Sequence, residues 1–151
     1  SKEEGRFSFY KEGFVRMKRR EAREQAFLLV FEQGITGESI DASIDAAGMS
    51  RDVIVDDFAE HLAKGVETHC SEVDEVISRY TRGWQFQRLS RVAVAALRLA
   101  IYEIRYENEI PGSVSINEAV ELAKKYGSAE DAPFVNGVLA SVMKEEKEAG
   151  E

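Results

Sequence analysis

The segment from Leu89 to Glu107, LSRVAVAALRLAIYEIRYE, decides the fold that the sequence predicts. Its apolar residues recur at offsets of three and four, which places their side chains on one face of an α-helix. These residues are Val92, Ala96, Leu97, Ala100, Ile101 and Ile104. An apolar stripe this wide is typical of a helix that other elements surround. We therefore expect this segment to be the central helix of the core.

Apolar spacing is helical on both sides of this segment, and we find no alternating strand pair after residue 17. The other helices are predicted at about Met17–Gln33 with a stop at Gly34, Glu38–Ala47 with a stop at Gly48, Asp52–Thr68, Ser71–Tyr80, from the Ser115–Glu118 capping box to Gly127, and Ala132–Glu148. A second capping box is read at Ser71 and Asp74, and Ile110–Pro111–Gly112 breaks the pattern. Seven helices with short connections predict an all-α bundle.

The composition bounds the class of protein. The chain has 151 residues, of which 44% are hydrophobic and 32% charged, as in one folded domain. No apolar run approaches the roughly 18 residues that span a membrane, so we expect a cytoplasmic protein. We expect residues 17–148 to form the helical domain, residues 1–16 to be an extension of unknown role and residues 149–151 to be a tail.

Candidate catalytic or metal-binding residues are few. Cys70 is the single cysteine, which excludes an internal disulfide, and the two histidines are His61 and His69. Asp57 lies four residues before His61, but no carboxylate–histidine–nucleophile order or three-ligand spacing follows. We therefore expect ordinary polar roles for these residues, an inert Cys70, no metal, no cofactor and no enzymatic activity.

The charge distribution is uneven. The net charge of −8 argues against a broad basic surface for duplex nucleic acid, yet residues 1–32 hold eight lysines and arginines against six acids. Arg16, Arg19, Arg20 and Arg23 share one helix face, which Ala26, Phe27 and Val30 continue as apolar. This pattern fits either a polyanion site or a solvated charged end. Three or four phosphate contacts to a single strand would give a log–log salt slope of about −2 to −3, a modest affinity that favours a partner.

Five segments together resemble the NusB family of bacterial transcription antitermination factors. They are REAREQA from Arg20, LRLAIYEI from Leu97, Ile110–Pro111, SINEAVELAKKYG from Ser115 and FVNGVL from Phe134. The resemblance covers about residues 17–144. It implies an all-helical fold of two packed sub-bundles that binds boxA, a short single-stranded RNA signal. It also implies a heterodimer with NusE, a small-subunit ribosomal protein, and recruitment to the RNA polymerase elongation complex with other Nus factors. Some members self-associate, so a homodimer stays open.

The resemblance also implies site residues. The RNA-binding positions fall on Lys18, Arg19, Arg20 and Arg23, and on Lys124, Asp131 and Phe134 near the loop before the last helix. The NusE-binding positions fall on Phe31, Gln87 and Ala93, although Ala93 is apolar where the family can have an acid. Phe31 and Phe134 equally fit core positions. Two other functions remain open: a NusB-like accessory domain of the kind found in ribosomal RNA methyltransferases, and a self-associating helical protein without an RNA role.

Overall fold

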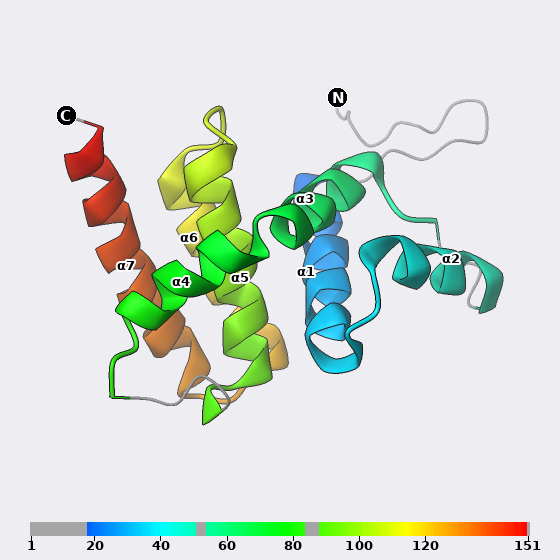
Figure 1. Cartoon of the computed structure of the whole chain (residues 1–151), viewed down its shortest axis with the longest axis horizontal. Coiled ribbons are helices and arrows are strands. Elements are labelled where there is room, and N and C mark those ends of the chain that lie inside the picture. The colour runs from blue at the N-terminus through cyan, green and yellow to red at the C-terminus, as the bar shows by residue number, and fades with distance from the viewer. Residues whose placement is uncertain (1–17, 51–53, 84–87, 151) are drawn as a thin grey trace.

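The computed structural model describes residues 18–50, 54–83 and 88–150, and within these ranges it contains seven helices and no strand (Figure 1). The helices are α1 (Arg19–Thr36), α2 (Ile40–Ser50), α3 (Asp57–Thr68), α4 (Cys70–Arg79), α5 (Arg91–Tyr106), α6 (Gly112–Tyr126) and α7 (Asp131–Ala149). The predicted all-α class is confirmed. None of these helices is long and apolar enough to cross a membrane.

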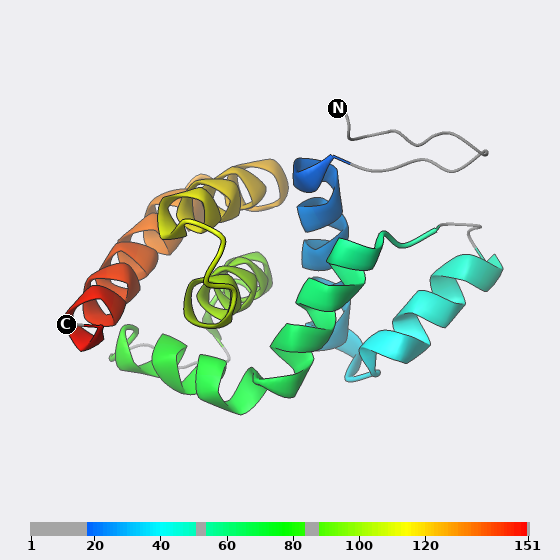
Figure 2. The ribbon, with the colours of Figure 1, turned by 90° about the horizontal axis from the view of Figure 1, so that it is seen from above.

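Helix α5 is the centre of the bundle, as its apolar stripe predicts. Figure 2 shows it between α6 and α7 on one side and α1 and α3 on the other, with α4 beneath. Its side chains are buried from Ala93 to Leu97 and from Leu99 to Glu103, and Leu97 and Ile101 have no exposed surface. Ser90 begins the helix, because its hydroxyl accepts a hydrogen bond from the backbone N–H of Ala93 at 3.2 Å.

Helix α1 runs through Gly34, where the sequence predicted its end. It ends at Thr36, followed by Gly37 in the left-handed region at φ 76°. Gly34 serves packing instead. Arg91 donates to its carbonyl oxygen at 3.0 Å, and a Cβ at Gly34 would lie 3.4 Å from Nη1 of Arg98. Gly34 is therefore a contact point between α1 and the two arginines Arg91 and Arg98 of α5.

Other predicted boundaries also move. Helix α2 continues through Gly48 to Ser50, and α3 begins only at Asp57, where Asp56 accepts a hydrogen bond from the N–H of Phe58. Helix α4 begins at Cys70, so Ser71 lies inside its first turn rather than at its cap. Helix α6 begins at Gly112, so the Ser115–Glu118 pair also lies inside a helix. Both predicted capping boxes are wrong, because the helices begin before these residues, and Asp74, Ser115 and Glu118 bond to side chains of other helices.

Candidate nucleic-acid interface

The first turn of α1 exposes three basic side chains, Lys18, Arg19 and Arg20, which we call the α1 basic tip. The guanidinium carbon of Arg19 lies 3.7 Å from the ring centroid of Phe58 on α3. This cation–π contact orients Arg19 without neutralising its charge. The backbone N–H of Lys18 donates to a carboxylate oxygen of Glu21 at 3.3 Å, which stabilises the helix start.

Arg20 has a carboxylate partner. Its Nε donates to Oε1 of Glu118 at 3.1 Å and its Nη2 donates to Oε2 at 2.8 Å, so the pair is bidentate. The side chain of Arg20 is 67% exposed, whereas that of Glu118 on α6 is 14% exposed. These hydrogen bonds raise the pKa of the Arg20 guanidinium.

Arg23 does not belong to the exposed tip, which corrects the prediction of four arginines on one accessible stripe. It is buried, and its Nε and Nη2 donate to the two carboxylate oxygens of Glu103 on α5, both at 3.0 Å. Ser115 on α6 donates to Oε1 of the same carboxylate at 2.7 Å. The arginines of α1 share one helix face, and α5 and α6 cover that face one turn beyond Arg19 and Arg20. Arg16 lies outside the described residues.

Basic and aromatic side chains at the end of α6 adjoin α1, and of these the sequence pattern indicated only Lys124. Lys125 donates to Oε2 of Glu24 at 2.6 Å, and the Tyr126 hydroxyl donates to the same oxygen. These two bonds lower the pKa of Glu24. The exposed Lys124 pairs with Glu121 at 3.5 Å. The dipeptide Lys125–Tyr126 just before Gly127 is the local signal that could have pointed to this contact.

Asp131 and Phe134 lie at the start of α7, where both have contacts within the fold. Asp131 is buried and accepts hydrogen bonds from the hydroxyl of Ser90 at 3.1 Å and the N–H of Ser128 at 2.9 Å. Phe134 is half-buried and packs against the core. The Asp131 carboxylate therefore links the start of α7 to Ser90, the N-cap residue of α5.

The predicted partner face contains a cavity between the end of α1 and the start of α5. It has a volume of about 230 Å³ and is lined by Val30, Phe31, Gly34, Leu89, Arg91, Val94, Ala95 and Arg98. Phe31 is half-buried and stacks on Phe27, with ring centroids 6.0 Å apart. Ala93 is 1% exposed, so its side chain faces the core rather than a partner. Gln87 lies outside the described residues.

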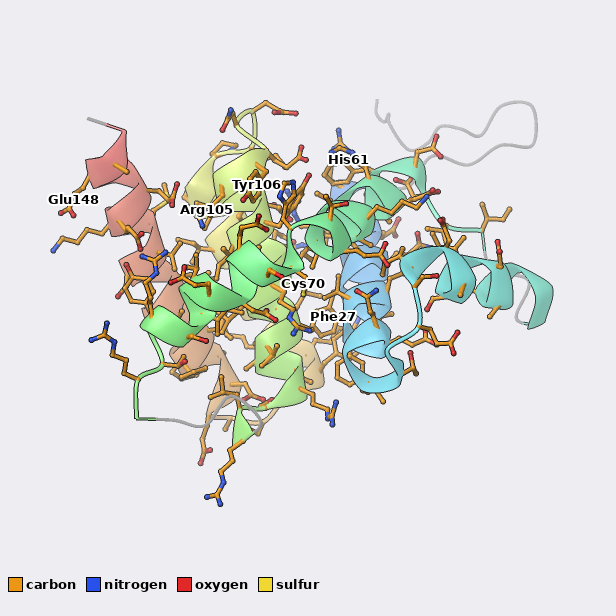
Figure 3. All side chains as sticks on the ribbon, in the orientation of Figure 1. Phe27, His61, Cys70, Arg105, Tyr106 and Glu148 are labelled. Carbon is orange, nitrogen blue, oxygen red and sulfur yellow. The ribbon has the colours of Figure 1, made fainter. Side chains whose placement is uncertain are left out.

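A separate polar cluster joins α3 to the end of α5, where Figure 3 labels His61 and Tyr106. Nε2 of His61 and the hydroxyl of Tyr102 each lie 2.6 Å from Oε2 of Glu107, and His69 stacks on Tyr106. Burial and the Glu107 carboxylate raise the pKa of Tyr102. Among the described residues, no group of three histidine, cysteine or acidic side chains is placed to hold a metal ion.

Known proteins resemble this chain along most of its length. The NusB family model matches residues 20–144. The transcription antitermination protein NusB of Desulfitobacterium hafniense is 42% identical over 131 residues, which cover 84% of this chain and 88% of the relative. The protein of that name from Listeria monocytogenes is 39% identical, with 87% of this chain and all of the relative covered.

Solved structures of NusB chains have the same fold as this chain. NusB of T. maritima has a TM-score of 0.75 and 34% identity, covering 85% of this chain and 92% of that one. A chain in a complex of antitermination factors NusB and NusE with double-stranded RNA has a TM-score of 0.73 and 27% identity, covering 83% and 96%. The protein described here therefore belongs to the NusB family of transcription antitermination proteins.

Proposed function

We propose that this chain is a non-enzymatic antitermination adaptor that binds boxA-type single-stranded RNA through the α1 basic tip. The observation that carries the proposal is the exposure of Lys18, Arg19 and Arg20 together, on a chain whose net charge is −8. A net negative chain repels a polyanion at long range, so a local basic tip favours one orientation of the RNA. The NusB–NusE–RNA structure similar to this chain supports an RNA ligand.

Lys18 and Arg19 make the main phosphate contacts in this proposal. Lys18 is exposed, and Arg19 is held on the Phe58 ring with its charge available. Arg23 instead acts inside the fold, because its bonds to Glu103 fix the start of α1 against α5. Lys124 and Lys125 extend the basic surface along α6, where a second part of the strand would lie.

NusE is the proposed protein partner, and the cavity beside Phe31 is its proposed docking site. This site has apolar walls formed by Phe31 and Val94, and it has the guanidinium of Arg91 at its edge. An apolar pocket with a charged rim is the usual anatomy of a specific protein interface. Through NusE and other Nus factors the complex would join the RNA polymerase elongation complex.

The RNA-binding assignment is tested by fluorescence anisotropy with a labelled boxA RNA oligonucleotide, with and without NusE. We expect Lys18→Ala/Arg19→Ala to weaken binding about tenfold in both conditions, since each lost phosphate contact removes part of the electrostatic free energy. The matched control is Lys144→Ala/Lys147→Ala, which removes the same charge from exposed positions near the C-terminal end of α7. Equal losses in the two double variants would contradict the assignment.

A further inference from the structure

The Ser115–Glu118 pair of α6 has the spacing of a capping box, but both side chains take part in the ion pairs of the α1 arginines. Ser115 donates to the carboxylate that holds Arg23, and Glu118 accepts two hydrogen bonds from Arg20. The Arg23 contacts are buried and stabilise the fold. The contact between Glu118 and Arg20 is at the surface, within the α1 basic tip.

Glu118 occupies the edge of Arg20 that a phosphate would use. A guanidinium presents its N–H groups as a planar fork, and it binds a carboxylate and a phosphate in the same bidentate manner. Here the fork edge formed by Nε and Nη2 is bonded to Glu118 at 3.1 and 2.8 Å. The remainder of the Arg20 side chain is exposed, so an incoming RNA strand can reach it.

We propose that Glu118 competes with RNA phosphate for Arg20 and thereby limits the affinity of the α1 basic tip. Its carboxylate acts as an intramolecular substitute for a phosphate group. RNA gains the Arg20 contact only when other contacts, such as those at Lys18 and Arg19, compensate for the displaced carboxylate. Glu118 thereby weakens the binding of single-stranded RNA to the tip, whatever the RNA sequence. This inference rests on the proposed RNA-binding function.

Competition between Glu118 and RNA for Arg20 predicts different effects on RNA affinity for substitutions at the two residues. Removing Arg20 should change RNA affinity little, because its positive charge is already matched by Glu118. Removing the charge of Glu118 should increase affinity, because Arg20 becomes available and a negative charge beside the RNA is lost. An increase is informative in itself, since a damaged fold would lower affinity.

The test compares Glu118→Gln with Glu121→Gln. Both variants remove one negative charge from the same helix face, but Glu121 acts on Arg20 only through electrostatics and without a hydrogen bond. Binding of labelled boxA RNA and of oligouridine of equal length is measured by anisotropy over a range of salt concentrations. We expect Glu118→Gln to bind both about three- to tenfold more tightly and to steepen the log–log salt slope by about 0.7. Glu121→Gln leaves the two Arg20–Glu118 hydrogen bonds in place and removes only the 3.5 Å pair with Lys124, so its gain should be smaller than that of Glu118→Gln and should not depend on Arg20.

The double variant Arg20→Ala/Glu118→Gln links the gain to Arg20, and we expect it to lose the increase. Equal affinities for Glu118→Gln and Glu121→Gln would overturn the inference, as would a gain that persists without Arg20. If Lys18→Ala/Arg19→Ala still weakens binding in that case, the RNA-binding function stands and only the role of Glu118 fails. If none of these variants alters binding, both proposals fail.

Discussion

Arg23 of α1 and Glu103 of α5 form an ion pair inside the core, although 80 residues separate them in the chain. Their side chains are 7% and 2% exposed, and Ser115 of α6 completes the hydrogen bonding of the carboxylate. A buried charge is tolerated only when it is paired and hydrogen-bonded. This pair therefore fixes the start of α1 against two other helices and sets the position of the basic tip.

Breaking this pair should destabilise the protein strongly. We expect Arg23→Ala to lower the free energy of unfolding by about 3–5 kcal/mol, since Glu103 would remain buried without its cation. Urea unfolding followed by circular dichroism measures the change. Arg20→Ala is the control, because its exposed side chain should contribute far less. Similar unfolding midpoints for the two variants would show that the pair does not hold α1.

Gly65 should be required for the contact between α3 and α5. A Cβ at this position would collide with the ring end of Tyr102, which is 5% exposed and bonded to Glu107. We expect Gly65→Ala to cost about 1–3 kcal/mol of stability. Gly137 is a helical glycine whose Cβ would meet no atom within 4 Å, so Gly137→Ala should stabilise by about 0.5–1 kcal/mol. Thermal melts of both variants should move in opposite directions; the idea fails if Gly65→Ala melts at or above the wild-type temperature.

Helical periodicity in the sequence was sufficient for the fold class and for the central place of α5. Periodicity could not predict at which turn of α1 other helices begin to cover its arginine-bearing face. Arg20 and Arg23 share a face by spacing, but only the arrangement of α5 and α6 leaves the first exposed and buries the second. Local periodicity carries no information about which distant helix packs over a given turn.

Local end signals failed where tertiary contacts use the same residues. Gly34 has the chemistry of a helix terminator, yet it lies inside α1, where its carbonyl oxygen accepts a hydrogen bond from Arg91 of α5. Glu118 has the chemistry of a capping residue, yet it pairs with Arg20. In both cases the competing partner is far away in the sequence, so a short motif cannot reveal it.

Cys70 should react slowly with thiol reagents. Burial, followed by the nearby Asp74 carboxylate, raises the pKa of its thiol. At pH 8 fewer molecules carry the thiolate than for a free cysteine, and the reaction should keep accelerating at a pH where free cysteine has levelled off. We expect a chromogenic disulfide reagent to react with native Cys70 several-fold more slowly than with glutathione. In the urea-unfolded chain, Cys70 should react at a rate comparable to that of glutathione. A native-state rate equal to the rate in urea would refute this prediction.

The cavity beside Phe31 should be needed for NusE but not for direct RNA contact. We expect Phe31→Ala to weaken NusE binding about tenfold or more, as for an aromatic anchor in a pocket. Arg91→Glu is a second variant of the same cavity, and we expect it also to weaken NusE binding. Because the Arg91 side chain is exposed, this substitution does not alter the core. Isothermal calorimetry with NusE, together with sedimentation of the free protein, measures both heterodimer and homodimer formation.

Binding of NusE at full strength by both variants would place the NusE site elsewhere. Loss of self-association with intact NusE binding would assign the cavity to a second copy of this chain. Thermal melts of each variant separate a lost contact from a lost fold.

The most direct test of the central claim is the salt dependence of boxA RNA binding. We expect a log–log slope of about −2 to −3 for the wild-type chain and a slope shallower by about 1.4 for Lys18→Ala/Arg19→Ala, since each cation releases about 0.7 counterion from a single strand. Lys144→Ala/Lys147→Ala should keep the wild-type slope. A slope unchanged by loss of Lys18 and Arg19 would contradict the claim that the α1 basic tip binds the RNA backbone.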